Sequence, residues 1–503
     1  MQSDDISLPG DFRGVHIHFV GIKGTGMAAL VEILSHKGAV ITGSDVSERF
    51  YTDDVLDRLG ISALPFSAKN ITDKVQYVIY SSAYKTDQNP DLIEALRRGV
   101  PCLLYTEALG SYSGRAYSCG VCGVHGKTST TGLVGTILKE IDDIPSQILA
   151  GSVINSFGGT CTYTSPLVAE NAGGQSVFVA ETCEYQRHFM SFRPKKIILT
   201  SVEPDHEDFF PTYEDIRQAF VDYICKLPPG GELIYCADDK GACDTVMIVR
   251  SLRPDIVMIP YGASASGDFS VRFCGVRGER NVFSLSLFGG GGEFALTMPG
   301  HHEVLDAAGA VALVCRLLVT FGKNPHDYYA KIKSGLLAFC GGKRRSEIVG
   351  HFCNKNGDDV LVIDDYGHHP TAVRTTLEGY REFYKGRKII VDFMSHTYSR
   401  TLALLPDFAR CFTSADELIL HKIYSSAREN PADFDVTGRS LYEAVLAAGQ
   451  KNVSYFEEVL DAEGFVRNLL DNPPGKEFPD GYLFVTMGAG DNWRLGRAVL
   501  DRR

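Results

Sequence analysis

A glycine-rich segment at residues 123–130, GVHGKTST, restricts the local fold more than any other part of the chain. It follows a short apolar run that ends at Cys122 and precedes a pattern typical of a helix. A turn of this kind gathers backbone N–H groups around an anion, and the N-terminus of the next helix adds its dipole. Lys127 supplies a positive charge, and the Thr128 hydroxyl suits Mg²⁺. The segment therefore predicts a strand, a polyphosphate-binding loop and a helix.

The loop departs from the common Walker spacing, which has a glycine six residues before the lysine. Position 121 is Val, so the motif is the variant GxxGKT. An ordinary glycine-rich turn between a strand and a helix is the alternative interpretation.

The formal charge argues against nucleic acid as a partner. Lys and Arg total 50 and Asp and Glu total 62, which gives a net charge of −12. A chain with this balance repels a polyanion unless its basic residues cluster. Any anionic ligand must therefore be held by local cations.

The chain has the features of a cytoplasmic protein without membrane contact. Its N-terminus is acidic and polar, and no run of roughly eighteen apolar residues occurs. The 13 cysteines, an odd number scattered through apolar runs, are typical of reduced thiols rather than of a disulfide framework. Cys119 and Cys122 form a lone CxxC pair, and zinc binding or redox chemistry there is the alternative.

At 503 residues the chain is too long for one core, and its pattern divides into three α/β blocks. We place their bounds at residues 1–113, 114–338 and 339–503. Apolar runs alternate with helical patterns in each block, which predicts mostly parallel sheets. The first block has a Rossmann-like pattern, and the second is P-loop ATPase-like. Alternation with glycine breaks at about 268–298 predicts antiparallel strands added to the second sheet.

The first block begins with a second glycine turn, GIKGTGMAA, in which Gly24, Gly26 and Ala29 match GxGxxA. Asp45 ends the next expected strand about twenty residues later, where a ribose-binding acid is expected. NAD and a UDP-sugar both present a pyrophosphate and a ribose, so this turn does not distinguish them. A turn needed only for close helix packing is the alternative.

Polar side chains follow two expected strands of the second block. Glu181 ends one apolar run, and His206 follows another. Together with Thr128, these residues suit one or two Mg²⁺ ions beside a polyphosphate. The alternative is that His206 caps the following turn and Glu181 is a solvated strand end.

The third block opens with a hinge, FCGGKRRSE, at residues 339–347. We interpret Lys343 as a surface residue of this hinge, whereas one of Arg344 and Arg345 has the planar guanidinium that suits phosphate or ribose oxygens.

Two strand-to-helix turns of the third block carry further candidates. DDYGHHPTAV contains Asp365, His368 and His369; the two adjacent histidines should point in different directions and not share a metal. In MSHTYSRT, His396 and Arg400 suit an amino-acid carboxylate. A helix cap and a surface arginine are the alternative for that second turn.

Taken in order, these motifs resemble those of the Mur ligases. The segments that carry the resemblance are GIKGTGM, YSSAY, GVHGKTST, AETCEYQRHF, EPDHED, GHHEVLD, KRRSE, DDYGHHPT, SHTYSRT and MGAGDNW. They span nearly the whole chain. GIKGTGM followed by GSD, together with DYGHHPT, is similar to the branch of the family that adds the first amino acid.

The resemblance implies an ATP-dependent, amide-bond-forming ligase of peptidoglycan synthesis. It would join L-alanine to UDP-N-acetylmuramate through an acyl phosphate, with ATP and Mg²⁺ or Mn²⁺. The N-terminal domain would hold the UDP substrate, the central domain ATP, and a Rossmann-like C-terminal domain would close over ATP and bring the amino acid. A monomer or weak homodimer that acts on small molecules, without nucleic acid or membrane partners, is expected.

The resemblance also implies roles for individual residues, of which Lys127, Glu181 and His206 would be catalytic. Thr128 and Glu181 would bind one metal ion, and His206 the second. The expected ATP-binding residues are Gly123, Val124, His125, Gly126, Lys127, Thr128, Ser129, His302, Asp306, Arg345 and Asp365. The expected UDP-substrate residues are Gly21, Gly24, Thr25, Gly26, Met27, Ser44, Asp45, Ser81 and Ser82. The expected amino-acid-binding residues are His206, His396 and Arg400.

The chain departs from the family motifs at several positions. Ser201 replaces an Asn, Thr397 replaces an Arg, and Glu303 and Asp306 replace both Asn residues of GxHNxxN. An Asp can accept a hydrogen bond from the adenine amino group but cannot donate one.

Three other functions share parts of this pattern. An NAD-dependent oxidoreductase would use the first block but leaves Lys127, Glu181 and His206 without a role. A P-loop ATPase that only changes shape would release phosphate without the other substrates. A recycling ligase that joins a preformed tripeptide to UDP-N-acetylmuramate shares most of the motifs and differs in the acceptor.

Overall fold

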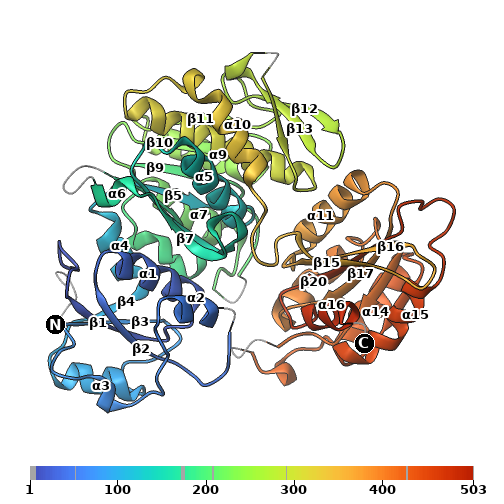
Figure 1. Ribbon diagram of the computed structural model, residues 1–503, viewed down its shortest axis with the longest axis horizontal. Helices are drawn as coiled ribbons and strands as arrows, with labels where there is room; N and C mark the ends of the chain where they lie inside the picture. Colours follow the sequence, from blue (N-terminus) through green and yellow to red (C-terminus); the bar gives the residue numbers. More distant parts are fainter. Residues whose placement is uncertain are drawn as a thin grey trace.

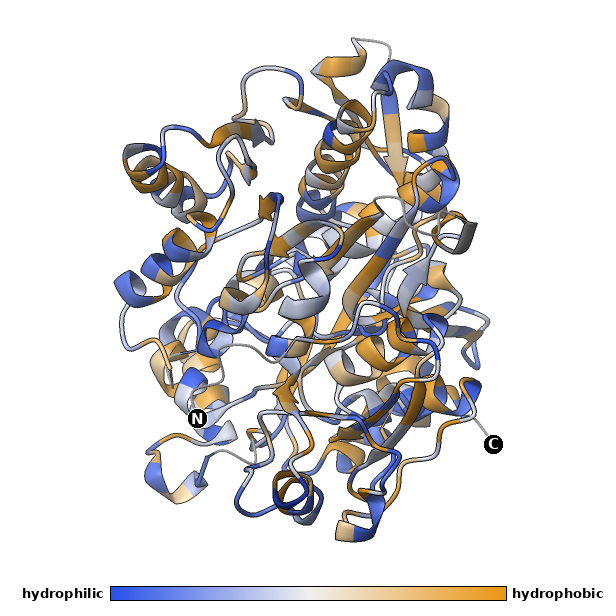
Figure 2. Ribbon diagram, turned by 90° about the vertical axis from the view of Figure 1, so that its left-hand side faces the viewer, coloured by the Kyte–Doolittle hydropathy of each residue, from blue (hydrophilic) through white to orange (hydrophobic). Residues whose placement is uncertain are grey.

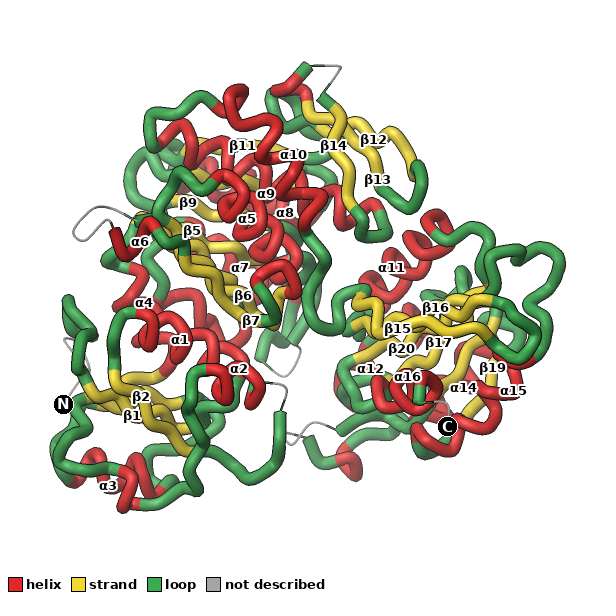
Figure 3. The backbone as a smooth tube through the Cα atoms, in the orientation of Figure 1, coloured by secondary structure: helices red, strands yellow, loops and turns green. Residues whose placement is uncertain are grey.

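The computed structural model describes residues 7–50, 52–170, 176–206, 209–289, 292–425 and 429–501. Within these residues the chain forms three α/β domains, and the N-terminal and C-terminal domains both lie against the middle one (Figure 1). Strands form the centre of each domain and helices cover them (Figure 3). Hydrophobic residues concentrate in these strands (Figure 2). No helix among the described residues is both long and apolar enough to cross a membrane.

The N-terminal domain contains a parallel sheet of order β2-β1-β3-β4. Its strands are β1 (His16–Val20), β2 (Val40–Ser44), β3 (Tyr77–Tyr80) and β4 (Cys102–Leu104). Its helices are α1 (Thr25–His36), α2 (Asp53–Arg58), α3 (Pro90–Arg97) and α4 (Tyr105–Ser113). The first glycine turn joins β1 to α1, and a Cβ at Gly26 would lie 2.7 Å from the Tyr105 ring. The order and pairing of these elements confirm the expected βαβαβ unit. The contact with Tyr105 explains why position 26 of the turn needs glycine.

The middle domain contains a larger sheet of order β11-β10-β9-β5-β8-β6-β7. Its strands are β5 (Tyr117–Cys122), β6 (Ser146–Ile154), β7 (Thr160–Thr164), β8 (Val177–Glu181), β9 (Lys196–Leu199), β10 (Glu232–Cys236) and β11 (Val257–Tyr261). All neighbours are parallel except β7, which pairs antiparallel with β6. The sequence analysis did not identify β6 and β7.

Helices cover both faces of this sheet. They are α5 (Lys127–Ile141), α6 (Leu167–Glu170), α7 (Tyr213–Ile224), α8 (Lys240–Leu252), α9 (His301–Thr320) and α10 (Tyr329–Ala338). Alternate residues of β8 point to opposite faces, so Val177 and Val179 join the core around α5 and α9. Phe178 and Ala180 join the core on the other face, around α7. The phosphate loop thus leads into α5, which is buried at the centre of the domain.

The antiparallel strands of the second block form a sheet of their own. They are β12 (Val271–Val276), β13 (Asn281–Leu285) and β14 (Glu293–Leu296). The sequence correctly predicted these strands. The prediction that they are added to the parallel sheet was wrong. Phe283 and Phe294 bury against the helical side of the domain, around α9 and α10. Packing on helices therefore keeps these strands apart from the parallel sheet.

The C-terminal domain contains a sheet of order β15-β16-β20-β17-β18-β19. Its strands are β15 (Glu347–Cys353), β16 (Asp359–Asp365), β17 (Lys388–Met394), β18 (Glu417–Leu420), β19 (Val453–Tyr455) and β20 (Tyr482–Gly488). Its helices are α11 (Pro370–Phe383), α12 (Tyr398–Ala403), α13 (Leu405–Phe408), α14 (Gly438–Ala447), α15 (Glu463–Asp471) and α16 (Trp493–Leu500). Only β15, at the edge, runs antiparallel to its neighbour in this sheet of the described residues.

The expected hinge links α10 to β15. Its first residues are tied to the middle domain, because the Lys343 amide donates to the Val153 carbonyl at 2.8 Å. The Lys343 side chain is partly exposed, with its ammonium 3.4 Å from a Glu347 oxygen. Lys343 is thus a surface residue, as predicted.

A buried ion-pair network joins β9, β10 and α9. Glu232 lies 2.6 Å from the Lys196 ammonium and 2.7 Å from an Arg316 nitrogen. The Lys196 side chain is only 2% exposed. Burial raises the pKa of Glu232, but Arg316 and Lys196 hold it below its usual range.

We expect Glu232→Ala to lower the stability of the middle domain by about 3–5 kcal/mol, because it leaves the Lys196 ammonium buried without its partner. Differential scanning calorimetry measures this change as a lower unfolding midpoint. The control Asp244→Ala removes the partner of Lys240, whose side chain is 90% exposed. That control should cost at most about 0.5 kcal/mol, and an equal effect of the two substitutions would contradict the prediction.

Candidate active site

A cavity of about 570 Å³ lies between the middle and C-terminal domains. It is lined by the phosphate loop, the ends of β8 and β9, the start of α9 and two strand-to-helix turns of the C-terminal domain. The structure brings most of the predicted ATP, metal and amino-acid residues to this one cavity. Those in its wall are Val124, His125, Gly126, Lys127, Thr128, Ser129, Glu181, His206, His302, Asp306, Arg345, Asp365, His396 and Arg400.

Close packing around the phosphate loop accounts for its glycines. A Cβ at Gly123 would collide with the Thr200 hydroxyl, and one at Gly126 with the Asp306 carboxylate. The Gly126 φ of 78° also favours glycine. Position 121, where the common Walker spacing has its first glycine, lies inside the strand β5. The loop between β5 and α5 is therefore shorter than the usual Walker loop.

Lys127 forms a buried ion pair with Glu184. Its ammonium lies 3.0 and 3.1 Å from the two carboxylate oxygens and also donates to the Val124 carbonyl at 3.2 Å. The Glu184 side chain is 1% exposed. Burial raises the pKa of Glu184, but Lys127 and His206 lower it below its usual range. Glu184 was not predicted from the sequence, although it follows Glu181 by three residues in AETCEY.

Thr128 and Glu181 lie in direct contact. The Thr128 hydroxyl donates to Glu181 Oε2 at 2.8 Å, and the Gly151 amide donates to the same oxygen at 2.7 Å. These two hydrogen bonds fix the Glu181 carboxylate in place, so Glu181 is not a solvated strand end. The pair supplies two oxygen ligands of the type that Mg²⁺ prefers.

His206 belongs to the same wall of the cavity. Its Nε2 atom is 3.5 Å from Glu184 Oε1, and its ring centroid is 4.8 Å from that of Tyr185. Its φ of 57° is the left-handed conformation, which turns the chain between Asp205 and the following helix. His206 and Lys127 thus share Glu184 as a neighbour.

The start of α9 contributes two buried carboxyl groups. The Ser129 hydroxyl donates to Glu303 Oε1 at 3.2 Å. Burial and the nearby charge of Asp365 raise the pKa of Glu303 to about 7. Burial and Glu303 raise the pKa of Asp306 well above its usual value.

Glu303 and Asp306 therefore tend to be protonated near neutral pH, and a protonated carboxyl group can donate as well as accept. A protonated Asp306 would also offer the donor that the sequence does not lead us to expect of an Asp. The pKa of the adjacent His302 is lowered to about 4 by burial, which keeps its ring neutral.

Arg344 and Arg345 have different environments. Arg344 donates to Asp364 at 2.9 Å and to the Gly488 carbonyl at 2.7 Å, so it holds the sheet together. Arg345 lies over the Tyr366 ring, with its guanidinium carbon 5.2 Å from the centroid, and lines the cavity. Arg345 is thus the arginine of the two that lines the cavity.

Asp365 is held by backbone groups. Its carboxylate accepts from the Ser346 and Gly367 amides, both at 2.8 Å. These bonds fix its position at the carboxyl end of β16, in the wall of the cavity.

The two adjacent histidines point in different directions, as expected. His368 Nδ1 lies 2.9 Å from the Tyr366 carbonyl oxygen. His369 caps α11, where its Nδ1 accepts from the Thr371 amide at 3.3 Å.

Arg400 joins the two domains through a buried ion pair. Its Nη2 atom donates to Asp205 Oδ1 at 2.6 Å, and both side chains are 8% exposed. Nη1 donates to the His396 carbonyl at 2.9 Å. Nε is buried without a hydrogen-bond partner among the described residues. Arg400 is therefore not a surface arginine, and Asp205 is a partner that the sequence analysis missed.

The predicted UDP-substrate residues gather elsewhere, around the glycine turn at the carboxyl ends of β1, β2 and β3. Asp45 Oδ2 accepts from the Lys23 amide at 2.7 Å, and Oδ1 accepts from the Tyr84 hydroxyl at 3.0 Å. The Ser44 hydroxyl is buried without a hydrogen-bond partner among the described residues. The other members of this group are Gly21, Gly24, Thr25, Gly26, Met27, Ser81 and Ser82.

Three family models match successive parts of the chain. They are described as Mur ligase family, catalytic domain (residues 16–117), Mur ligase middle domain (121–314) and Mur ligase, glutamate ligase domain (344–474). The chain belongs to the Mur ligase family. The family and the α/β fold class predicted from the motifs are thereby confirmed.

Individual Mur ligases match over nearly full length. A UDP-N-acetylmuramate–L-alanine ligase of Treponema pallidum (strain Nichols) is 44% identical over 497 residues, 98% of each chain. Among solved structures, a UDP-N-acetylmuramate-alanine ligase from Thermotoga maritima has a TM-score of 0.73 at 23% identity, covering 97% of this chain and 98% of the other. A murein peptide ligase from Psychrobacter arcticus 273-4 has a TM-score of 0.64 at 22% identity, with the same coverage. The two structures support the shared Mur ligase fold.

The raised pKa of Glu303 predicts a stability that depends on pH. Between the ordinary pKa of 4.5 and about 7, the folded protein binds more protons than the unfolded chain. Stability should therefore fall as the pH rises through this interval. Glu303→Gln removes the titrating group, so the wild type should lose about 1–3 kcal/mol relative to this variant between pH 5 and pH 8.

Unfolding midpoints of the ligand-free proteins at both pH values measure this difference. The exposed Glu443 on α14 provides the control Glu443→Gln, which should follow the wild type at both pH values. Parallel profiles for the wild type and Glu303→Gln would show that Glu303 does not titrate in this way.

Proposed function

We propose that this Mur ligase joins L-alanine to UDP-N-acetylmuramate in peptidoglycan synthesis, with conversion of ATP to ADP and phosphate. One observation carries the proposal: a single cavity joins a phosphate loop of the middle domain to Arg400, a buried cation of the C-terminal domain whose Nε has no hydrogen-bond partner among the described residues. Such a cavity suits an ATP-activated acid at one end and an amino-acid carboxylate at the other. The full-length relative named for this activity supports the same conclusion.

The phosphate loop would hold the β and γ phosphates of ATP. Backbone amides at the start of α5 point toward this position, and Lys127 adds a positive charge that Glu184 holds in place. The buried carboxyl groups of Glu303 and Asp306, with Arg345 and Asp365 from the other domain, would contact the rest of the nucleotide. ATP is thereby bound from both domains.

The donor set at the phosphate end fits a divalent cation. The Thr128 hydroxyl and the Glu181 carboxylate suit Mg²⁺, and the imidazole of His206 also suits Mn²⁺. A bound cation neutralises phosphate charge that otherwise repels the approaching carboxylate. Lys127 contributes to the same neutralisation from the protein side.

The reaction would proceed in two steps. The lactyl carboxylate of UDP-N-acetylmuramate attacks the γ phosphorus, which forms an acyl phosphate and releases ADP. The neutral amine of L-alanine then attacks the acyl carbon, forms the amide and releases phosphate. The residues act mainly by positioning and by electrostatic stabilisation, because the bonds form between the substrates themselves.

Arg400 would hold the carboxylate of L-alanine. Asp205 accepts from Nη2 at 2.6 Å and the His396 carbonyl accepts from Nη1 at 2.9 Å, which leaves Nε without a partner among the described residues and available to a substrate oxygen. His396, at the same turn, lines the cavity beside it. This arrangement would place the amine of L-alanine near the phosphate end.

The N-terminal glycine turn would bind the UDP part of the other substrate. Asp45 and the buried Ser44 hydroxyl lie at the carboxyl end of β2, where ligands of such sheets bind. We further propose that the protein acts in the cytoplasm as a monomer or a weak homodimer.

The test is phosphate release by the purified chain with ATP and UDP-N-acetylmuramate. L-Alanine, L-serine, glycine and a murein tripeptide are supplied separately, and we expect release to be fastest with L-alanine. Reactions without UDP-N-acetylmuramate or without an acceptor serve as controls and should release almost no phosphate. Turnover only with the tripeptide would assign a recycling role instead, and release without either substrate would leave a simple ATPase.

Arg400→Lys tests the amino-acid end of the cavity. Lysine keeps a cation for Asp205 but lacks the fork of guanidinium donors. We expect the KM for L-alanine to rise at least about tenfold, which corresponds to one lost charge-assisted hydrogen bond. The KM for ATP should change by less than about threefold. Equal changes in both constants would show that Arg400 acts only through domain closure.

A further inference from the structure

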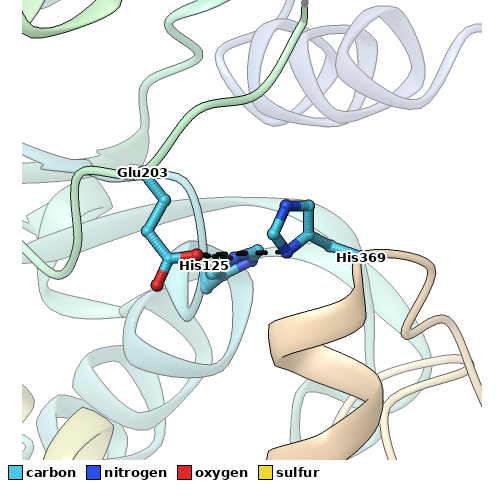
Figure 4. Close-up of side chains that lie close together, drawn as sticks. All are labelled: His125, Glu203 and His369. Atoms are coloured by element: carbon cyan, nitrogen blue, oxygen red, sulfur yellow. Dashed lines mark ion pairs between the residues drawn. The ribbon is translucent and has the colours of Figure 1, made fainter. Parts of the chain in front are cut away.

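Three side chains that the proposed mechanism does not use as metal ligands converge beside the phosphate loop. They are His125 of the loop itself, Glu203 after β9, and His369 at the start of α11 (Figure 4). One ligand atom from each lies within 4.8 Å of the other two. His125 and Glu203 belong to the middle domain and His369 to the C-terminal domain, so the cluster spans the junction of the two.

The separations within the cluster are too long for hydrogen bonds. His125 Nε2 lies 3.5 Å and His369 Nδ1 lies 3.9 Å from Glu203 Oε2. Good N–H···O bonds measure about 2.7–3.2 Å. His125 Nε2 is also buried without a hydrogen-bond partner among the described residues. The three atoms therefore surround a space that they do not close by bonding to one another.

These separations suit a tetrahedral transition-metal ion. Ligand atoms at about 2.0–2.1 Å from such an ion lie roughly 3.3 Å from each other. A movement of a few tenths of an ångström would bring the two distances to Glu203, 3.5 and 3.9 Å, close to that value. The two imidazole nitrogens lie within 4.8 Å of each other, and the motion of one domain against the other would set their final separation. Two imidazoles and one carboxylate form a ligand set typical of zinc sites that keep a fourth position open.

The protonation of the cluster also suits a cation. The Thr371 amide donates to His369 Nδ1 at 3.3 Å, so this nitrogen carries a lone pair and not a proton. A metal ion bound at Nδ1 would take this lone pair in place of that long hydrogen bond. Burial lowers the pKa of His369 to about 4. Burial raises the pKa of Glu203, but His125 and His369 lower it below its usual range. At neutral pH the cluster thus offers a neutral imidazole and an ionised carboxylate, as a metal requires.

We propose that His125, Glu203 and His369 bind a transition-metal ion of the Zn²⁺ class at the junction of the middle and C-terminal domains. This site is separate from the cation position that Thr128, Glu181 and His206 would form. The neighbouring Arg400 is neutralised by its ion pair with Asp205, so it does not add a net positive charge to the cluster. Because the ligands come from two domains, a bound ion would hold the C-terminal domain against the phosphate loop.

Co²⁺ titration of the full chain, followed by visible absorption, tests this site without any substrate. An excess of Mg²⁺ is included to occupy positions made of oxygen ligands. We expect one tight Co²⁺ equivalent with absorption in the visible range, displaced by Zn²⁺. Isothermal titration calorimetry with Zn²⁺ gives the affinity of the same site.

Two conservative substitutions remove one ligand each. His369→Asn keeps a side chain that caps α11 well but lacks the imidazole. Glu203→Gln keeps the shape of Glu203 and removes its charge. Each should weaken Zn²⁺ binding at least about tenfold, while thermal unfolding without metal verifies that the variant is folded. His351→Asn, at an exposed histidine of β15, is the matched control and should bind as the wild type does.

Other variants assign the ion if the proposal is wrong. Binding that survives both His369→Asn and Glu203→Gln would overturn it. Loss of binding in His206→Asn, with His369→Asn unaffected, would move the ion to the phosphate end of the cavity. A strong near-ultraviolet sulfur band would assign the ion to cysteines. Because no substrate is present, these outcomes do not depend on whether L-alanine is the amino acid.

Discussion

The buried ion pair between Arg400 and Asp205 is the contact on which the site depends. Removing two charges from water costs several kcal/mol for each ion, and only close pairing offsets that cost. The pair measures 2.6 Å and joins the middle domain to the C-terminal domain. It also holds the pKa of Asp205 well below its usual range, despite the burial that would raise it. The two charges meet across the junction of the domains, so the cavity walls of the two domains are joined at this contact.

The remaining carboxyl groups of the cavity differ in charge because their surroundings differ. Glu184 faces Lys127 and stays ionised, so it can position a cation beside the phosphates. Glu303 and Asp306 lie together without such a close partner, and burial raises their pKa values. A cationic neighbour thus favours the ionised form of Glu184, whereas burial beside another carboxyl group favours the protonated forms of Glu303 and Asp306.

Most of the architecture was predictable because it depends on local patterns. Alternating apolar runs and glycine turns can be recognised within stretches of about twenty residues. These local patterns correctly predicted three α/β units with mostly parallel sheets. Strands β6, β7 and β15 were missed, and the short sequences of β7 and β15 mix polar and apolar residues without a continuous apolar run. The prediction that β12, β13 and β14 join the parallel sheet was wrong, because strand pairing depends on which helices cover the strands.

The sequence by itself determined the two glycine-rich turns and the family, because each motif consists of residues close together in the chain. Tertiary structure alone decided the partners: Glu184 for Lys127, Asp205 for Arg400, and the meeting of His125 with His369. The last two pairs join residues about 200 positions or more apart. Charge and burial depend on such distant neighbours, so the protonation of Glu303 and Asp306 was not readable from their motif. Only the packing of two domains against one loop supplies that environment.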